Sequence, residues 1–455
     1  MAEMTYIDTL IANAKKAQKE FESYTQEQVD ELVRAMGKVI YDNAEELARE
    51  AVEETGYGRV DSKIIKLRKS SMAAWFYMKG KKSTGILEYD TMNDLVLIAK
   101  PLGVVAALVP TTNPTSTMAS NGMSIIKCKN ACIISPHPRA KKCTMHGFQL
   151  IRDELDRLGA PKNIFQIVEE LSVENTDELM KKSDVIVATG GTGMVKAAYS
   201  SGRPSFGVGP GNDQVVVAPD YTDYDFIAKT VVGSRSYDNG MACVGEQALH
   251  VQKDRMDDVV SAFLANDAAM IPDDKLPKLQ EMLFKPNGSV DAAHVGMTAL
   301  EIADYLGITV PESTQLLIFK CPGMTRDNWL RREKMCPLVQ FFPYDTFNDA
   351  LANAKSNLEW EGAGHTSIVY TNDKQAAEQV GVTLPVSRVL VNMPGNAASG
   401  GNFINGLAPT MSLGCGSWGN NSISENLTYR HMMNVTRLAY YHDSTMPEPE
   451  KVWGE

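Results

Sequence analysis

The chain has 455 residues, of which 44% are hydrophobic and 22% are charged, so it is globular in composition and too long for a single core. Its net charge of −11, without a basic stripe, argues against a nucleic-acid partner, and no apolar run approaches the roughly 20 residues that would span a bilayer. The seven cysteines form no C-x-x-C pair and the seven histidines are scattered, so we expect reduced thiols, a cytoplasmic protein and no metal site.

The first 100 residues are expected to form two helices and a hairpin. Apolar residues recur at helical spacing from Ile7 to Phe21, and Thr25–Gln28 has the form of a capping box that begins a second helix within the first 55 residues. Residues 85–100 contain two short apolar runs around a turn, which indicates a hairpin.

From residue 103 onward, apolar strands alternate with segments long enough for crossover helices. The expected strands lie at 103–109, 131–135, 164–168 and 184–188, and a second set follows at 248–251, 316–319, 366–370 and 389–392. Continuous apolar strands that alternate with helices predict a parallel sheet covered on both faces. We therefore predict an α/β chain with two such domains.

Two of the turns are rich in glycine. The strand at 184–188 runs into Thr189-Gly190-Gly191-Thr192-Gly193, which opens a helix whose unpaired N–H groups and dipole suit a pyrophosphate. Because this is not G-x-G-x-x-G, a ligand-binding turn and a purely structural turn are equally compatible with it. The second turn, Ser205–Asn212, has more glycines than one loop needs, which would let the backbone approach a neighbouring group closely.

A proline-bracketed turn, Pro110-Thr111-Thr112-Asn113-Pro114, ends the strand at 103–109. Ligands of open α/β sheets gather at the carboxyl ends of strands, where the Asn113 amide could donate to a developing oxyanion. Taken alone, asparagine and proline are more often ordinary turn residues.

The segment Asn239–Cys243 delivers one cysteine to the start of an apolar stretch. A thiolate there would add to a carbonyl, and the hemithioacetal could lose hydride to an oxidised nicotinamide. In isolation, a cysteine beside methionine and alanine is more often a small buried hydrophobe. The chemical role of Cys243 is favoured because the other turns described above occur in the same chain.

Together and in this order, these segments resemble the aldehyde dehydrogenase superfamily. Pro110–Asn113 is similar to its oxyanion turn, Thr189–Gly193 to its cofactor-phosphate turn and Asn239–Cys243 to its nucleophile segment. Glu333–Pro337 looks like the element whose acid holds the nicotinamide ribose. The likeness is strongest to the coenzyme-A-acylating branch, including the N-terminal half of bifunctional aldehyde–alcohol dehydrogenases. It implies an α/β, aldehyde dehydrogenase-like fold with a Rossmann-type cofactor domain, an α/β catalytic domain and a small β oligomerisation element.

The resemblance assigns roles to particular residues. Cys243 is the expected nucleophile, with Asn113 and the Cys243 backbone N–H as oxyanion donors. His365 matches the acylating branch and could help to deprotonate the thiol of coenzyme A (CoA), although a structural histidine is at least as compatible. NAD or NADP is the implied cofactor, and the residues expected to hold it are Pro110, Thr111, Thr112, His137, Arg139, Thr189, Gly190, Gly191, Thr192, Gly209 and Glu333.

The choice between NAD and NADP depends on the turn Ser135–Lys141, which corresponds to the family's adenosine-ribose turn. Arg139, Lys141 and Lys142 could contact a 2′-phosphate and so favour NADP. They are equally a solvated basic helix start, and similar turns occur in relatives that use NAD, so NAD is expected first.

One departure from the superfamily bears on the product. Hydrolytic members carry a glutamate where this chain has Gly207, and no acid lies between Ser205 and Asn212. Without a positioned base, attack by water should slow by about 10²–10⁴-fold, so the acyl group on Cys243 should wait for a thiol. We therefore expect the reversible reaction of an aldehyde, CoA and NAD(P)⁺ to acyl-CoA and NAD(P)H. The alternative is a hydrolytic aldehyde dehydrogenase that releases the free acid.

The aldehyde itself is weakly specified. Arg235, Tyr237 and Met241 are expected to line the substrate pocket together with the loop 397–405. Small aldehydes such as acetaldehyde are the default of the branch. Arg235 and the Asn- and Ser-rich loop could instead hold the sulfonate of sulfoacetaldehyde, and the two substrates are equally compatible with the sequence.

The resemblance also suggests domain limits and assembly. A cofactor domain is expected at 1–235, with the hairpin at about 85–100 in the oligomerisation element, a catalytic domain at 236–424 and an oligomerisation segment at 425–455. We expect a homodimer or homotetramer whose other partners are the small-molecule aldehyde and CoA, with neither nucleic acid nor membrane involved.

Overall fold

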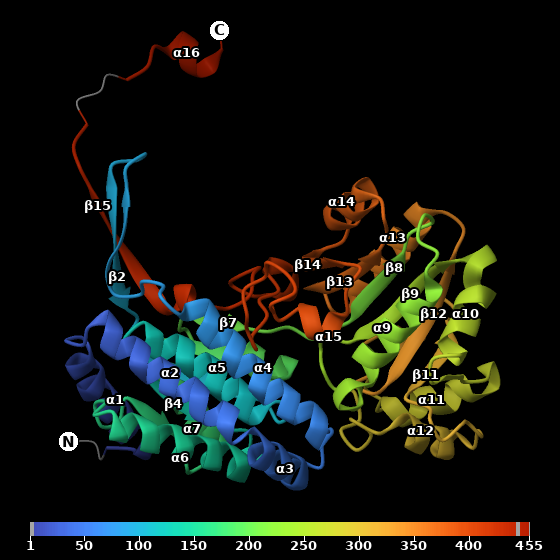
Figure 1. Ribbon diagram of the computed structural model, residues 1–455, viewed down its shortest axis with the longest axis horizontal. Coiled ribbons are helices and arrows are strands. Elements are labelled where there is room, and N and C mark those ends of the chain that lie inside the picture. Colours follow the sequence, from blue (N-terminus) through green and yellow to red (C-terminus); the bar gives the residue numbers. More distant parts are fainter. Residues whose placement is uncertain (1–3, 443–445, 455) are drawn as a thin grey trace.

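The computed structural model describes residues 4–442 and 446–454, with only the backbone of Thr192. Two α/β lobes lie side by side, and a narrow β arm projects from the first (Figure 1). Four helices open the chain: α1 (Tyr6–Phe21), α2 (Gln26–Asp42), α3 (Ala44–Thr55) and α4 (Val60–Met78).

The start of α2 confirms the predicted capping box. The Thr25 hydroxyl accepts the N–H of Gln28 at 3.3 Å, and the Gln28 side chain accepts the N–H of Thr25 at 2.8 Å. The first 55 residues form three helices, however, and not the two expected. Asn43 ends α2 and α3 begins at the next residue, a break that leaves the apolar periodicity almost uninterrupted.

The first lobe is built on five parallel strands in the order β5-β4-β3-β6-β7. Their bounds are β3 (Val104–Leu108), β4 (Ala131–Ser135), β5 (Phe165–Ile167), β6 (Val185–Ala188) and β7 (Ser205–Gly207). The crossover helices are α5 (Pro114–Lys127), α6 (Lys141–Arg157), α7 (Val173–Lys182) and α8 (Thr192–Ser200). The four strands predicted here from their apolar runs are confirmed, and β3 and β4 are buried along their whole length.

The second lobe is built on seven parallel strands in the order β10-β11-β12-β9-β8-β13-β14. They are β8 (Asp213–Val217), β9 (Glu246–Gln252), β10 (Ala268–Met270), β11 (Leu316–Lys320), β12 (Leu338–Tyr344), β13 (Gly364–Tyr370) and β14 (Val386–Val391). The helices are α9 (Tyr224–Ser236), α10 (Met256–Leu264), α11 (Leu276–Leu283), α12 (Ala299–Leu306), α13 (Phe347–Trp360), α14 (Lys374–Thr383) and the short α15 (Gly395–Ala398).

The change of sheet corrects the expected domain limit. β8 pairs with β9 and β13, so residues 213–236 belong to the second lobe and the sheets change between β7 and β8 rather than at residue 235. The reason is that an apolar strand such as Val215–Val217 fits either parallel sheet. Its residues alone do not say which partner strands it joins.

The projecting arm is a three-stranded antiparallel sheet of β1 (Gly85–Asp90), β2 (Leu95–Pro101) and β15 (Met433–Ala439). The predicted hairpin is confirmed, and the C-terminal segment adds the third strand. Beyond it, α16 (Pro449–Trp453) lies away from both lobes (Figure 1). Exposed apolar side chains concentrate here, among them Tyr89, Met92, Tyr440, Tyr441 and Trp453.

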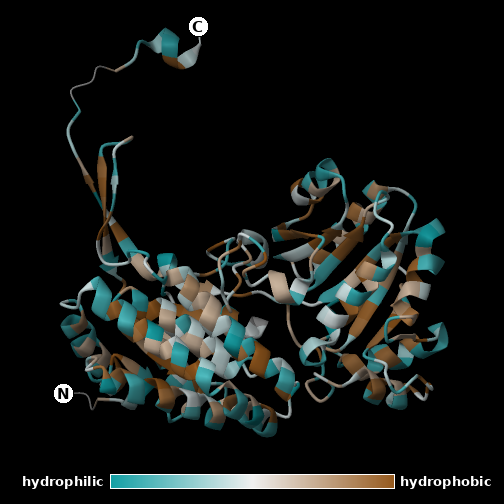
Figure 2. Cartoon of the chain, viewed as in Figure 1, coloured by the Kyte–Doolittle hydropathy of each residue, from teal (hydrophilic) through white to brown (hydrophobic). Residues whose placement is uncertain are grey.

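Hydropathy follows the layers in both lobes (Figure 2). Apolar colour concentrates on the strands and on the inward faces of the helices, with polar residues outside. Within the described ranges, no helix is long and apolar enough to cross a membrane.

Candidate active site

The nucleophile turn lies where the two lobes meet. It follows α9, and its residues Asp238 and Asn239 adopt left-handed φ angles of 51° and 55°. At Gly240, φ is 69° and a Cβ would lie 2.3 Å from the Cys336 carbonyl carbon, so only glycine fits. This tight turn places Cys243 just before β9.

Cys243 is half-buried and packs among apolar neighbours, including Val208, Val244 and Leu413. The glycine-dense loop after β7 lies directly against it, because a Cβ at Gly211 would fall 1.7 Å from the Cys243 carbonyl oxygen. Burial, followed by the carboxyl groups of Glu333 and Asp213, raises the pKa of the Cys243 thiol. The thiol is therefore protonated at neutral pH and needs positive charge or a base to react.

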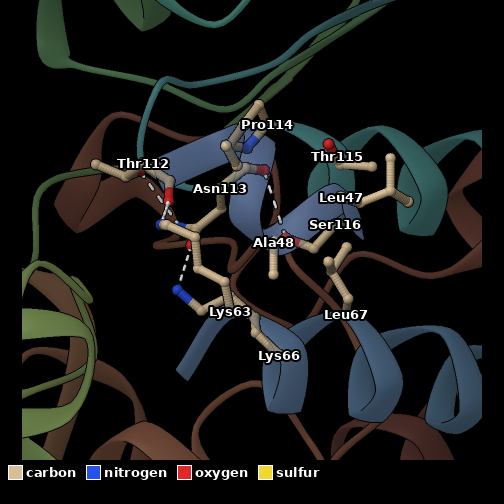
Figure 3. A pocket seen from close by; sticks show the side chains of 11 residues that line it. Leu47, Ala48, Lys63, Lys66, Leu67, Thr112, Asn113, Pro114, Thr115 and Ser116 are labelled. Atoms are coloured by element: carbon tan, nitrogen blue, oxygen red, sulfur yellow. Dashed lines mark hydrogen bonds between the residues drawn. The ribbon is translucent and has the colours of Figure 1, made fainter. Parts of the chain in front are cut away.

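The predicted oxyanion residue, Asn113, lies at the carboxyl end of β3 beside two lysines of α4 (Figure 3). The Lys66 ammonium donates to Asn113 Oδ1 at 2.5 Å and to Asp238 Oδ2 at 2.7 Å. Lys63 donates to the Thr112 carbonyl at 3.1 Å and to Asp238 Oδ2 at 3.2 Å. Asp238 thus ties α4 to the nucleophile turn.

His365 lies at the start of β13 and is fully buried, as is its partner Asp213 at the start of β8. The two side chains meet at 3.0 Å through Nδ1 and Oδ1, while Nε2 of His365 has no protein partner. Burial, followed by the Arg388 guanidinium, lowers the pKa of His365 to about 3, so the imidazole is neutral at physiological pH. Burial raises the pKa of Asp213 well above its ordinary value.

The expected absence of a water-activating acid is compatible with the space at Gly207. A Cβ there would lie 2.6 Å from Val195 Cγ1 and 2.8 Å from the Tyr199 ring, so a glutamate would not fit without movement. Asp213 is the acid of this region that sequence reasoning overlooked. It is wholly buried and engaged by His365, which disfavours a role in activating water.

Glu333 is half-buried close to the same loop, and its own N–H donates to Glu361 Oε2 at 2.9 Å. Burial, followed by the charge of Glu361, raises the pKa of its carboxyl group to about 8. The Glu333 carboxyl group contributes to the raised pKa of Cys243, and the Arg235 guanidinium opposes the rise in the pKa of Glu333. This predicted cofactor ligand therefore lies close enough to Cys243 for their charges to interact.

The predicted phosphate turn follows β6, and Gly191 is the N-cap of α8 with no side chain capping the helix. A Cβ at Gly191 or Gly193 would have nothing within 4 Å, so the space beside these two glycines is open. The Thr189 hydroxyl lies 2.8 Å from that of Ser412. An uncapped helix N-terminus of this kind fits a diphosphate group.

A cleft of about 500 Å³ separates the two lobes next to this machinery. Its lining includes Tyr57 and Arg139 from the first lobe, Asn239 of the nucleophile turn, and Gly296 and Thr298 from the second. Its size suits a nucleotide-containing ligand. It therefore brings the predicted cofactor residue Arg139 and the nucleophile turn to one opening.

The Arg139 side chain is not free within that cleft. Its guanidinium donates to the Tyr57 hydroxyl at 2.9 Å and to the Thr55 carbonyl at 3.2 Å. His137 accepts the N–H of Arg139 through Nδ1 at 3.1 Å, which shapes the turn. Arg139 is therefore already engaged within the protein.

The expected substrate residues are placed differently from the sequence-based prediction. Arg235 is 0% exposed and donates to the Leu338 carbonyl and Gln247 Oε1, a geometry that does not support a sulfonate contact. Tyr237 donates its hydroxyl to the Ser62 carbonyl, and Met241 is buried. Both side chains are therefore engaged within the protein, where they support the nucleophile turn.

The polar loop 397–405 is also largely satisfied within itself. The side-chain amides of Asn402 and Asn405 donate to the carbonyls of Ala397 and Ala398 at 2.8 and 3.0 Å. Neither amide is held ready for a substrate anion.

One group of metal-type ligands occurs in the described part of the chain, made of Glu46, Glu50 and His146 on α3 and α6. His146 Nδ1 lies 2.8 Å from Glu50 Oε2, so these two side chains already contact each other. It lies outside the site around Cys243 and we assign it no role.

Comparison with known proteins agrees with this geometry. The family model described as aldehyde dehydrogenase family matches residues 1–282. The chain is 46% identical over 456 residues to the succinate-semialdehyde dehydrogenase (acetylating) of Clostridium kluyveri, covering 100% of both chains. It is 38% identical over 451 residues to the sulfoacetaldehyde dehydrogenase of an Acholeplasma species, covering 98% of this chain and 93% of the relative. The crystal structure of an acetylating aldehyde dehydrogenase from Geobacillus thermoglucosidasius matches with a TM-score of 0.92 at 34% identity, covering 97% of each chain.

Proposed function

Since the chain belongs to the aldehyde dehydrogenase family, in its CoA-acylating branch, we propose that it acts on a short aldehyde with a terminal anionic group, succinate semialdehyde first. The enzyme class is an NAD(P)-dependent oxidoreductase that exchanges an aldehyde and CoA for an acyl-CoA. The observation that carries the choice of substrate is the 46% identity, end to end, with a succinate-semialdehyde enzyme. A relative named for sulfoacetaldehyde, another anionic aldehyde, supports the class.

In the first step, the Cys243 thiolate attacks the aldehyde carbon. The new C–S bond turns the carbonyl oxygen into an oxyanion, which the Asn113 side-chain amide and the Cys243 N–H stabilise. The Lys66 ammonium lowers the pKa of Cys243 against the larger opposing effect of burial, which assists loss of the thiol proton. Packing of Gly211 against the Cys243 carbonyl keeps the nucleophile segment fixed during attack.

The glycine turn and the cleft fit a nicotinamide dinucleotide, which when bound supplies the acceptor for the hydride that the hemithioacetal loses. The uncapped N-terminus of α8 would hold its diphosphate, and Glu333 its nicotinamide ribose. Because the Arg139 guanidinium already donates hydrogen bonds to Tyr57 and Thr55, it is not free to bind the 2′-phosphate of NADP, and we propose NAD as the first choice of cofactor.

In the second step, the thiol of CoA displaces the acyl group from Cys243, so one thioester replaces another and the reaction is reversible. The CoA thiol must lose its proton. We assign the base role to His365: with Nδ1–H donating to Asp213, the lone pair on Nε2, which has no partner among the described residues, accepts the proton. Because no carboxylate stands at Gly207, water competes poorly for the acyl group.

We also propose that the enzyme is a cytoplasmic homo-oligomer. The seven cysteines are all free thiols, as is usual in reducing compartments. The arm exposes several aromatic side chains on an antiparallel sheet with open edges, which suits pairing with another copy.

The test is NAD(P)H formation by the purified enzyme with succinate semialdehyde, sulfoacetaldehyde and acetaldehyde, each with and without CoA. Butyraldehyde is the matched control because it has the same carbon chain as succinate semialdehyde without the carboxylate. We expect kcat/KM to be at least about 10-fold higher for succinate semialdehyde than for butyraldehyde, because the anion adds a specific contact. Equal values would overturn the substrate class. Free acid formed equally fast without CoA would overturn the acylating reaction in favour of hydrolysis.

A further inference from the structure

Two lysines one helical turn apart on α4 point toward the oxyanion turn, but they make different contacts (Figure 3). Both ammonium groups reach Asp238 Oδ2, at 3.2 Å from Lys63 and 2.7 Å from Lys66. Only Lys66 also reaches the side chain of Asn113, at 2.5 Å. Lys63 reaches the backbone carbonyl of Thr112 instead.

The contact with Lys66 fixes which end of the Asn113 amide is available. An ammonium group has three donors and no acceptor, so it can bond only to the oxygen of the amide. The oxygen must therefore face Lys66, and the N–H₂ must face the other way. Among the described residues, that N–H₂ has only the Thr112 hydroxyl as a partner, at a long 3.3 Å. The donor is thus oriented and nearly free for a ligand.

The charge balance keeps this ammonium in place. One buried carboxylate, Asp238, faces both lysines and also accepts the N–H of Arg59 at 2.9 Å. Burial raises the pKa of Asp238, but Lys66 and Lys63 outweigh it and hold the pKa below its ordinary value, so the carboxylate stays ionised. Burial, followed by Lys66, lowers the pKa of Lys63 to about 8.

The Lys66 ammonium also links the oxyanion donor Asn113 to the turn that carries Cys243. Asp238 lies five residues before Cys243 in the nucleophile turn, and its left-handed φ of 51° needs outside support. Lys66 holds this turn and the oxyanion donor together, although the three residues come from distant parts of the chain. Catalytic donors and nucleophiles must keep their positions to within about 0.5 Å, which such a bridge supplies.

We propose that Lys66 is a positioning residue for the addition step, holding the Asn113 amide with its N–H₂ aimed at the aldehyde oxygen. The ammonium also polarises the amide, because a hydrogen bond to the oxygen makes the N–H₂ a stronger donor. Lys66 does not touch the aldehyde. This inference rests on the proposed acylating reaction but not on which aldehyde is the substrate.

The test compares Lys66→Met with Lys63→Met, which removes the equivalent Asp238 contact but leaves the Asn113 contact intact. Both variants and a Lys66→Arg variant are assayed with succinate semialdehyde and with butyraldehyde, after a thermal melt that checks folding. For Lys66→Met we expect kcat to fall by about 10–100-fold with both aldehydes and KM to change by less than about 3-fold, because an oxyanion contact acts in the transition state. Lys63→Met should lose less, and Lys66→Arg should recover part of the loss.

A double-mutant cycle with Asn113→Ala gives the decisive readout. If Lys66 acts mainly through the amide, Lys66→Met should cost much less once Asn113 is alanine, and the small remaining loss reports the contact of Lys66 with Asp238 and its effect on Cys243. Multiplicative losses would overturn the proposal, as would equal losses in Lys63→Met and Lys66→Met. A rise in KM confined to succinate semialdehyde would also overturn it, and would identify Lys66 as a ligand of the substrate anion. Failure of succinate semialdehyde as a substrate affects only the proposed function, because butyraldehyde still reports on the addition step.

Discussion

Two clusters flank the reactive cysteine, and they treat charge differently. On the side of α4, the Lys63 and Lys66 ammonium groups both lie within 3.2 Å of Asp238 Oδ2, although the three side chains are only 5%, 11% and 0% exposed. On the side of β8 and β13, Asp213 and His365 are both 0% exposed, and burial opposes charge on each of them. The first cluster keeps the Asp238 carboxylate ionised, whereas burial disfavours charge on both members of the second.

The difference matches the two half-reactions. In the proposed mechanism an oxyanion forms beside Asn113 when the thiolate adds, so fixed positive charge and oriented donors are useful there. A proton must be taken from CoA in the second half-reaction, and a histidine can accept it only when its imidazole is neutral. The predictions below test whether each cluster serves its own step, beginning with the nucleophile that both steps share.

Removing the shared nucleophile should have the largest effect. We expect Cys243→Ala to abolish NAD(P)H formation and the reverse reduction of acyl-CoA, since both pass through a bond to its sulfur. The matched control is Cys321→Ala, because Cys321 is also a half-buried free thiol and follows β11, outside the nucleophile turn. Residual turnover in either direction by Cys243→Ala would remove this residue from the mechanism.

Removing the oxyanion donor should have the next largest effect. Asn113→Ala should lower kcat by about 10²–10³-fold, the usual loss for one such donor. Asn113→Asp has the same shape but places a carboxylate where negative charge develops, so it should be at least as slow. Stopped-flow measurement of the first turnover of NAD(P)H isolates this step, and a first turnover of normal rate in either variant would contradict the assignment.

The positions of the turns could be predicted from sequence because the patterns that mark them are local. Proline around Asn113, glycine before α8 and the segment before Cys243 are short patterns with a stated physical use. Strands buried on both faces were equally visible as continuous apolar runs. β12 was not predicted, since Gln340 and Pro343 interrupt its apolar run.

The partners of these turns could not be predicted, because they come from contacts distant in sequence. Lys66 is 47 residues from Asn113 and 172 from Asp238, and Asp213 is 152 from His365. A lysine pair at helical spacing is ordinarily a solvated face. Arg235 shows the converse difficulty. It lies eight residues before Cys243 in the sequence and was expected to line the substrate pocket, but its side chain is 0% exposed.

Changing the buried pair should affect the second half-reaction selectively. We expect His365→Gln and Asp213→Asn to lower CoA-dependent turnover by about 10–100-fold, because the thiol loses its base or the base loses its orientation. The first turnover of NAD(P)H should stay within about 3-fold of normal, because the addition step depends on Asn113 instead. His250→Gln is the matched control, since His250 is likewise fully buried and lies on the neighbouring strand β9. Equal loss in both phases, or the same pattern in the control, would make His365 a structural residue.

The smallest effect concerns pH and the cofactor. The carboxylate of Glu333 should accept the ribose hydroxyls, yet its pKa in the free enzyme is raised to about 8 by burial and by Glu361. Below that pH the group is mostly protonated, and binding must first expel the proton. KM for NAD(P)⁺ should therefore rise as pH falls from about 9 to 7, by at most about 10-fold per pH unit. Glu333→Gln cannot titrate, so its KM should be higher at pH 9 and flat across this range. If the KM of Glu333→Gln for NAD(P)⁺ still rises as the pH falls, the titrating group is a different residue.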